Sequence, residues 1–522
     1  MANKTTAEAG ELVGALRAAL GDNAVRTDEA SLGLFANDVY RTGGKPLAAV
    51  RPGSVETLQQ AVRLCAAAGV AMVPRGGGAS YTDGYVRPEG GHVLFDTGAL
   101  DSIEIDEANA TATVGAGVTW ANLKAALDAK GLRTPFYGPF SGIAATVGGS
   151  ISQNTLSHGS TAHGISAQSL LGLDVVLASG ELISTKACGG MRFYGPDLTG
   201  LFTGDCGVFG IKTAIRLPLI AFRPQFECLS FAFDDFASFH AGARAAQLAR
   251  IEDSQFSLDL ALSQGQIGRQ EGLGARMAIA VEVMRKAPNK LKGVAQLMRM
   301  ALAGEDPMRA GAYMCHFIVD GHDAEETAVK GKQLRRILAP HGGREVANSI
   351  PTFVRSVPFA PLFNILGPGG ERWVPIHGVF AHDQAVPFDA AFKALLASRK
   401  AEMERLGVWV GTMFSPVGSS GFLYEVALYW PDSRTDYHVA ALGEEYLSQQ
   451  PQFAPNPEAR VYADDLKEAI IATMQAHGAG HFQIGRAYPY QQRLSEQAKG
   501  LLRAIKNELD PAGLMNPGAL GF

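Results

Sequence analysis

Residues 74–84 read Pro-Arg-Gly-Gly-Gly-Ala-Ser-Tyr-Thr-Asp-Gly, and they follow a short apolar run, Val70–Val73, that predicts a strand. Small residues after a strand expose successive backbone N–H groups on one concave side, and such a nest binds phosphate oxygens. The stretch matches neither the G-x-G-x-x-G dinucleotide pattern nor the P-loop pattern. Taken alone, a flexible turn explains it equally well, so its meaning depends on the rest of the chain.

A second tract of small residues, Ser141–Asn154, reads Ser-Gly-Ile-Ala-Ala-Thr-Val-Gly-Gly-Ser-Ile-Ser-Gln-Asn. We expect its backbone to lie against a flat cofactor and to hydrogen-bond its edge, although a tight turn between buried strands is the alternative. A third, weaker segment, Asp205–Ile211, opens a strand at Gly210 and Ile211 that could meet an adenine or isoalloxazine edge. Two such tracts close together favour a cofactor site over two unrelated turns.

The composition excludes several classes of protein. The chain has 522 residues, which suggests two to four structural units, and its net charge of −5 argues against a nucleic-acid partner. We find no secretory signal and no apolar run long enough to span a membrane, and the five scattered cysteines suggest reduced thiols. A cytoplasmic enzyme is therefore expected.

The order of predicted elements divides the chain into three parts. Residues 1–222 mix helices, such as 6–22 and 54–68, with short strands, so an α+β unit holds the glycine-rich loops. Residues 223–455 alternate longer strands and helices, which suggests a second sheet-plus-helix domain. Residues 456–522 are expected to return to the first domain. Further expected helices are 120–130, 236–249, 388–406, 457–475 and 501–509, and the expected strands include 48–51, 93–96, 103–106, 112–114, 171–177, 181–183, 226–233 and 422–429.

Several motifs, in order along nearly the whole chain, resemble the vanillyl-alcohol oxidase and para-cresol methylhydroxylase (PCMH) flavoprotein superfamily. The resemblance implies an α+β fold: a PCMH-type FAD-binding domain made of two α+β subdomains, and a cap domain with an antiparallel sheet over the flavin. It also implies FAD as the cofactor. The matching segments are Arg-Pro-Gly-Ser-Val-Glu-Thr-Leu (51–58), Pro-Arg-Gly-Gly-Gly-Ala-Ser (74–80), Ala-Thr-Val-Gly-Gly (145–149), Leu-Gly-Leu-Asp-Val-Val-Leu (171–177), Gly-Pro-Asp-Leu-Thr-Gly-Leu-Phe (195–202), Gly-Val-Phe-Gly-Ile (207–211) and Leu-Asp-Pro-Ala-Gly-Leu-Met-Asn-Pro-Gly (509–518).

The resemblance also implies which residues bind the cofactor. The loop at 75–81 would wrap the pyrophosphate, and the tract at 141–154 would contact the ribityl chain and the isoalloxazine. The full expected set is Arg75, Gly76, Gly77, Gly78, Ala79, Ser80, Tyr81, Ser141, Gly142, Thr146, Gly148, Gly149, Ser152, Asn154, Gly159, Gly210, Ile211 and Asn516.

The substrate is less clear, because two branches of the superfamily are each matched in part. The 2-hydroxy-acid dehydrogenases (D-lactate and glycolate types) carry histidine-rich cap motifs, and the segments at 375–383 and 478–486 reproduce them only in degraded form, so we expect no metal. The phenol-oxidising branch matches better at 369–376 and 407–414, and Tyr81 falls at its phenol-binding tyrosine. However, Phe482 and Gln483 stand where that branch has Tyr-Arg. An alcohol or phenol-type substrate is expected, with a 2-hydroxy acid as the alternative.

Five side chains are the candidates for catalysis: His158, His377, Arg486, Tyr81 and Tyr488. A histidine would accept the hydroxyl proton, and an arginine would hold an anionic end of the substrate. The cap around Gly370 has no His or Tyr for covalent attachment, so we expect non-covalent FAD, with His158 and His377 as the residues that could overturn this. The electron acceptor (oxygen, a quinone or a cytochrome) and the oligomeric state, for which a homodimer is one alternative, stay open.

Overall fold

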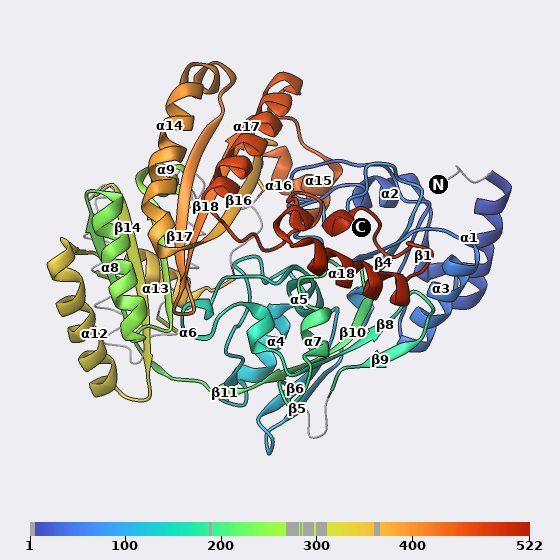
Figure 1. The fold of residues 1–522 in the computed structure, drawn as a ribbon, viewed down its shortest axis with the longest axis horizontal. Coiled ribbons are helices and arrows are strands. Elements are labelled where there is room, and N and C mark those ends of the chain that lie inside the picture. Colours follow the sequence, from blue (N-terminus) through green and yellow to red (C-terminus); the bar gives the residue numbers. More distant parts are fainter. Residues whose placement is uncertain are drawn as a thin grey trace.

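The computed structural model describes residues 6–186, 191–267, 311–359 and 366–522, with a few helical residues between 281 and 298. Figure 1 shows two parts side by side. The blue and teal N-terminal part carries three small sheets, and the green to orange part carries one large sheet. The dark red C-terminal segment runs back over the N-terminal part.

The first sheet contains the strand that precedes the glycine-rich loop. Its order is β1-β2-β4-β3, with β4 parallel to both β2 and β3. The helix between β2 and β3 begins as the sequence predicts, because Ser54 and Thr57 form a capping box. The elements are α1 (Thr6–Leu20), β1 (Val25–Arg26), α2 (Glu29–Phe35), β2 (Ala48–Val50), α3 (Val55–Ala67), β3 (Met72–Arg75) and β4 (Val93–Asp96).

The second sheet is fully antiparallel, in the order β5-β6-β10-β8-β9, and a two-stranded ribbon pairs β7 with β11. Gly180 makes the turn of the β8–β9 hairpin with a φ of +80°. The elements are β5 (Ile103–Asp106), β6 (Thr111–Gly115), α4 (Trp120–Asp128), β7 (Leu132–Arg133), α5 (Val147–Gln153), α6 (Ser160–His163), β8 (Gly172–Val176), β9 (Leu182–Ser184), α7 (Leu198–Leu201), β10 (Ile211–Pro218) and β11 (Ile220–Ala221).

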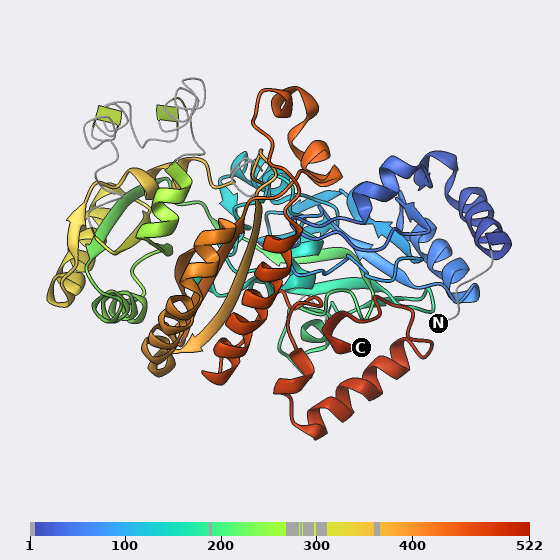
Figure 2. The same cartoon turned by 90° about the horizontal axis from the view of Figure 1, so that it is seen from above.

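The cap is a seven-stranded antiparallel sheet in the order β15-β12-β14-β13-β17-β18-β16. The helices α8, α12 and α14 cover one face, where phenylalanines and tyrosines pack together. Figure 2 shows from above that the cap lies beside the N-terminal part. The elements are β12 (Gln225–Phe233), α8 (Phe236–Ala249), β13 (Ser254–Asp259), α9 (Leu260–Ile267), β14 (Tyr313–Gly321), α12 (Ala324–Leu338), β15 (Arg344–Val346), α13 (Ser349–Ser356), β16 (Arg372–Ala381), α14 (His382–Leu406), β17 (Trp409–Val417), β18 (Gly421–Trp430), α15 (Asp436–Leu442) and α16 (Glu444–Ser448).

The C-terminal part serves both domains. Helix α17 (Pro457–Ala476), capped by Asn456, still packs on α14, β16 and β18 of the cap. The chain re-enters the N-terminal part after it, through α18 (Glu496–Leu509) and a short pairing in which Asn516 N–H donates to the Met72 carbonyl. Strand β3, which leads into the glycine-rich loop, thus pairs with β4 on one side and with the C-terminal segment at Asn516 on the other.

Three local predictions differ from the structure. The tract at 141–154 is not a simple loop, because Thr146 caps helix α5 within it. Helix α14 begins at His382 and contains Pro387, whereas the prediction started it after that proline. Helix α18 begins at Glu496, five residues before the predicted start, because Ser495 accepts a hydrogen bond from Ala498 N–H.

Candidate FAD and substrate site

A cavity of about 900 Å³, part of it open to solvent, lies between the two glycine-rich tracts. Fourteen of the expected cofactor-binding residues line it: Arg75, Gly76, Gly77, Gly78, Ala79, Ser80, Tyr81, Ser141, Thr146, Gly148, Gly149, Ser152, Gly210 and Ile211.

The two tracts need their glycines because they pack directly on each other. A Cβ on Gly77 would lie 1.7 Å from the Ala144 carbonyl oxygen, and a Cβ on Gly76 would lie 2.4 Å from Thr146 Oγ1. A Cβ on Gly148 would likewise lie 2.7 Å from Ala116. The close approach leaves backbone, rather than side chains, as the wall of the cavity.

Arg75 provides a test of whether this cavity fits an anionic cofactor. Its guanidinium lies over the rings of Phe35 and Tyr85, at 5.0 and 5.3 Å from the ring centroids, and its Nε is buried without a hydrogen-bond partner. Among the described residues no carboxylate forms an ion pair with it. A buried cation is costly unless it is paired. Asp96, opposite Arg75 on β4, acts on its charge without forming an ion pair. A pyrophosphate in the cavity would supply a counter-charge in direct contact, so the residues present fit FAD.

Four expected cofactor residues do not line the cavity but support its walls. Asn154 ends α5 in the left-handed conformation and accepts from Ala167 N–H. Gly142 packs under Phe359, and Gly159 packs against the Pro135 carbonyl. Asn516 donates to the Gly84 and Cys206 carbonyls, at 2.9 and 2.6 Å. These contacts hold the loops in place.

Several lining residues were not among the expected set. Gln153 and Gln483 line the cavity from different segments, and Gln483 N–H donates to the Gln153 carbonyl at 2.8 Å. Lys212, which follows Ile211, also lines it and is paired with the buried Asp205. Only Lys212 carried a sequence signal, a charge directly after the Gly210-Ile211 pair. Nothing in the sequence brought Gln483 next to residue 153.

Arg486, expected to anchor the substrate, is not among the lining residues. Its guanidinium donates to the Asp83 carbonyl at 2.6 Å, to Asn516 Oδ1 at 2.7 Å and to the Pro517 carbonyl at 2.8 Å. These bonds use its forked donors to fasten the C-terminal segment to the loop after Tyr81. The prediction that Arg486 binds the substrate therefore finds no support in this geometry.

His158 is likewise engaged within the protein. Its Nε2 donates to the Pro358 carbonyl at 2.6 Å, and its ring stacks on Tyr137 and meets Phe140 edge-on. Burial lowers the pKa of this imidazole to about 4. The neutral imidazole of His158, surrounded by aromatic rings, connects the N-terminal part to the cap through its hydrogen bond to Pro358. His158 does not line the cavity.

The other three catalytic candidates do come together. Tyr488 Oη accepts from the His377 backbone N–H at 3.0 Å and lies 3.2 Å from His377 Nδ1, while the rings of Tyr81 and His377 meet edge-on at 6.0 Å. Phe482 stacks on His377 at 3.9 Å. Since Tyr81 and Gln483 also line the cavity, this group marks the end of the cavity that faces the cap.

Burial sets the protonation of this group. It raises the pKa of Tyr81 and Tyr488 well above their usual value, so both stay neutral phenols. It lowers the pKa of His377 to about 3, with the nearby His481 adding to the effect. His377 Nε2 has no hydrogen-bond partner in the described part of the chain. The histidine is therefore a neutral polar group whose Nε2 makes no direct hydrogen bond, although the Gln483 side chain lies close enough to act on its pKa.

Sequence reasoning missed Glu425, which stands directly across from His377 in the pairing of β18 with β16. The residue is 9% exposed, and no hydrogen bond or ion pair reaches it from the described residues. Its charge raises the pKa of both Tyr81 and Tyr488, which shows that it shares their surroundings. The signal was present: Glu425 is the only charged residue in Gly421–Trp430, a run otherwise typical of a buried strand.

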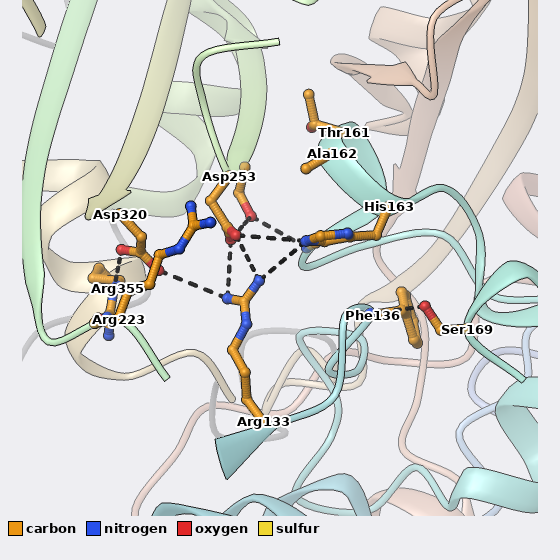
Figure 3. A network of polar contacts seen from close by, with 12 residues as sticks. Arg133, Phe136, Thr161, Ala162, His163, Ser169, Arg223, Asp253, Asp320 and Arg355 are labelled. Atoms are coloured by element: carbon orange, nitrogen blue, oxygen red, sulfur yellow. Dashed lines mark hydrogen bonds and ion pairs between the residues drawn. The ribbon is translucent and has the colours of Figure 1, made fainter. Parts of the chain in front are cut away.

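A buried ionic network joins the N-terminal part to the cap (Figure 3). Arg133 of β7 donates to both carboxylate oxygens of Asp253, at 3.1 and 2.5 Å, and lies 3.7 Å from Asp320. Arg355 of α13 pairs with Asp320 at 3.1 Å. His163 lies at the edge of the network, 3.9 Å from Asp253. Charges from β7, β14, α13 and the segment before β13 thus fix how the cap sits beside the cavity.

Comparisons with known proteins agree with this geometry. Residues 46–186 match the FAD binding domain family. The glycolate oxidase subunit GlcD of Bacillus subtilis is 35% identical over 175 residues, which is 34% of this chain and 37% of that protein. A probable mitochondrial D-2-hydroxyglutarate dehydrogenase of Oryza sativa subsp. indica is 24% identical over 95% of this chain and 79% of its own length.

The fold is matched over the whole chain. A crystal structure of p-cresol methylhydroxylase with substrate bound superposes with a TM-score of 0.73, at 19% identity, over 99% of this chain and 98% of that one. The fold and the site define an FAD-binding protein. Residues 46–186 are therefore an FAD-binding domain, and the whole chain has the fold of p-cresol methylhydroxylase, as the resemblance in sequence implied. In the described part of the chain, no helix is both long and apolar enough to cross a membrane.

Proposed function

We propose that this protein is an FAD-dependent oxidoreductase that oxidises a small alcohol or a benzylic or aromatic hydroxyl substrate. The observation that carries the proposal is the meeting of Tyr81, Gln483, His377 and Tyr488 at the end of the cofactor cavity. When bound there, the flavin supplies a two-electron acceptor at N5. The protein must bind the hydroxyl, orient the carbon that bears it and exclude water.

The residues divide these tasks. The backbone of the loop at 75–80 and the guanidinium of Arg75 hold the pyrophosphate, and the tract at 146–152 holds the rest of the cofactor. Neutral phenols at Tyr81 and Tyr488 and the free Nε2 of His377 offer hydrogen bonds to a hydroxyl. Trp373 and Phe482 pack around them and provide apolar walls. This set is suited to an uncharged aromatic or aliphatic alcohol.

The second candidate is a 2-hydroxy acid, in line with the printed names of the Bacillus and rice relatives. A carboxylate needs a cationic or multi-donor partner when it is buried. Arg486, which was expected to supply the charge, is committed to the C-terminal segment. The alcohol is therefore the preferred substrate class.

Anaerobic mixing of the holoprotein with a panel of benzylic alcohols, alkylphenols, aliphatic alcohols and 2-hydroxy acids tests the proposal. We expect loss of the oxidised flavin bands with at least one alcohol or phenol and slower loss with every hydroxy acid. A panel in which only hydroxy acids reduce the flavin would favour the second candidate. Reoxidation of the reduced protein by oxygen, a soluble quinone or a cytochrome then identifies the class of acceptor.

A further inference from the structure

Glu425 is a buried carboxylate that the sequence analysis did not use. Its neighbour Tyr424 points to the opposite face of the sheet, where Tyr424 Oη donates to Asp389 at 2.9 Å. Because side chains alternate along a strand, Glu425 lies on the other face, the one that carries His377. The carboxylate thus lies on the side of His377, close enough to Tyr81 and Tyr488 to raise their pKa, and Tyr81 lines the cavity. It has no hydrogen-bond or ion-pair partner in the described part of the chain.

The charges around Glu425 are one-sided. The groups that face it are the phenols Tyr81 and Tyr488, the neutral His377 on β16, and the uncharged Met413 opposite it on β17. Among the described residues, no lysine or arginine shifts the pKa of Glu425, Tyr81, Tyr488 or His377. Glu468 acts on Tyr488, and His481 acts on His377. Arg493 acts on His481 but on none of the four groups named above. A substrate here meets negative charge without a compensating cation.

We propose that Glu425 accepts the proton of the substrate hydroxyl and that its charge makes the site select neutral substrates over anionic ones. The inference rests on the proposed function and narrows it to uncharged primary or secondary alcohols, benzylic alcohols included. As the substrate O–H bond breaks, its proton goes to Glu425 and the electron pair of that bond forms the C=O bond. The C–H bond breaks at the same carbon, and its two electrons leave as hydride to the flavin. An alcohol and a carboxylate thereby become a carbonyl compound and a carboxylic acid.

The acidity of the group agrees with this role. Burial raises the pKa of Glu425 to about 7, so a large fraction is a free base near neutral pH. A general base works best when its pKa lies near the working pH. His377, with its pKa lowered to about 3, is a much weaker base. It remains a positioning residue for the hydroxyl.

Binding of non-reactive probes tests the charge selection without turnover. Benzamide and benzoate share a ring and differ in charge, and their affinities are measured by calorimetry at pH 8 and pH 6. We expect benzamide to bind at least tenfold tighter than benzoate at pH 8, a gap of about 1.4 kcal/mol. The gap should shrink at pH 6, where Glu425 is largely protonated. In Glu425→Gln the gap should close at both pH values.

Glu345→Gln is the matched control, because Glu345 is an exposed carboxylate of the same sheet that pairs with Arg335. It should leave the ratio of the two affinities as in the wild type. Equal affinities in the wild type, an unchanged ratio in Glu425→Gln, or failure of benzamide to bind would each overturn the selection by Glu425.

The role in proton transfer has its own readout. With the best neutral substrate, the rate of anaerobic flavin reduction should rise with pH through an apparent pKa near that of Glu425, about 7. Glu425→Gln should slow it on the order of 100-fold or more and remove this pH dependence, and Glu425→Asp should recover part of both. An unchanged pH profile in Glu425→Gln would rule Glu425 out as the proton acceptor. Flavin reduction by hydroxy acids alone would overturn the neutral-substrate inference while leaving an FAD-dependent oxidoreductase intact.

Discussion

Among single residues, Glu425 and Arg486 differ in how their buried charges are compensated. Glu425 is an isolated carboxylate, and Arg486 is a cation with several acceptors around it. The sequence suggested the opposite assignment for Arg486, because a guanidinium between glycine and aromatic residues is typical of an anion site. The carbonyls that accept hydrogen bonds from its guanidinium belong to Asp83, about 400 positions away along the chain, and to Pro517 in the C-terminal segment. No local sequence pattern could therefore reveal them.

The raised pKa of Glu425 predicts a pH-dependent stability. The folded protein holds this proton up to about pH 7, whereas the unfolded chain loses it near the ordinary pKa of 4.5. The free energy of unfolding therefore falls as pH rises between these values. Glu425→Gln should be more stable than the wild type above pH 7, by at most about 3 kcal/mol, and the difference should vanish near pH 4.

Urea titrations of both proteins at pH 5, 6, 7 and 8 check this prediction. A difference in the free energy of unfolding that does not grow with pH would show that Glu425 has an ordinary pKa in the folded protein. Glu345→Gln serves again as the exposed control.

Arg486→Met tests the structural assignment of the guanidinium. The change removes donors to the Asp83 and Pro517 carbonyls and to Asn516, and it leaves buried acceptors unsatisfied. We expect a loss of roughly 2–4 kcal/mol in unfolding free energy. Because Arg486 does not line the cavity, the Michaelis constant for the best substrate should change by no more than about threefold. That factor corresponds to about 0.65 kcal/mol of binding free energy. A selective rise in that constant at unchanged stability would restore Arg486 as the substrate anchor.

At the scale of elements, the glycines of α5 allow the helix to form one wall of the cofactor cavity. Gly149 is the informative position, because a Cβ there would contact only Thr146 Oγ1, at 3.1 Å, and would otherwise enter open space. Gly77 is less useful, since a Cβ there would strike the Ala144 backbone and disturb the loops themselves.

Gly149→Leu should fold and lose most of its flavin, because the side chain would occupy the cavity that Gly149 lines. Gly500→Leu on α18 is the control, since a Cβ there meets nothing within 4 Å. The ratio of flavin to protein, from absorbance after purification, and the circular dichroism spectrum measure the two effects. Full flavin content in Gly149→Leu would mean that the cofactor does not use this wall.

In the cap sheet, the pairing of two strands brings together site residues that the sequence does not connect. Strands β16 and β18 read as buried strands in sequence, and only their pairing brings His377 opposite Glu425. The register between two strands is set by the whole sheet, because a slip of one residue would turn both side chains to the other face.

At the scale of the whole molecule, the network of Arg133, Asp253, Asp320 and Arg355 couples the cap to the N-terminal part. Asp253→Asn should cost about 3–5 kcal/mol in unfolding free energy, because Arg133 would keep a buried charge without its main partner. Asp234→Asn, in an exposed pair with Arg344, should leave the stability unchanged.

The paired change Arg133→Met with Asp253→Leu sharpens this test. Replacing both charges with apolar side chains of similar size should recover most of the stability that Asp253→Asn loses. Thermal unfolding of the three variants makes the comparison. A paired variant no more stable than Asp253→Asn would indicate that the two residues do not act as a pair.

Whether the flavin can be bound covalently depends on the space that the packed cap leaves at Gly370. At Gly370 of the cap, a Cβ would lie 2.3 Å from the Asp432 carbonyl, so no larger side chain fits at that position. We expect acid precipitation to release most of the flavin into the supernatant. A fluorescent protein band on a denaturing gel would instead show a covalent bond.

The sequence by itself determined the local structure and the cofactor. Caps such as Ser54 and Asn456, the alternation along the strands and the spacing of the glycines depend on residues within a few positions of one another. These signals predicted individual helices, strands and loops, whereas the PCMH-type fold and FAD were implied by the resemblance of whole motifs to the superfamily.

The tertiary structure alone decided the substrate end of the site. The left-handed turn at Gln483 places it beside Gln153, and Arg486 closes on the C-terminal segment. Glu425 meets Tyr81 and Tyr488. These contacts join segments that are between 30 and more than 300 residues apart. Such contacts depend on how two domains and a returning tail pack together. A contact between two distant segments produces no repeating pattern in the sequence, so the sequence does not show which residue, or which charge, a side chain will meet.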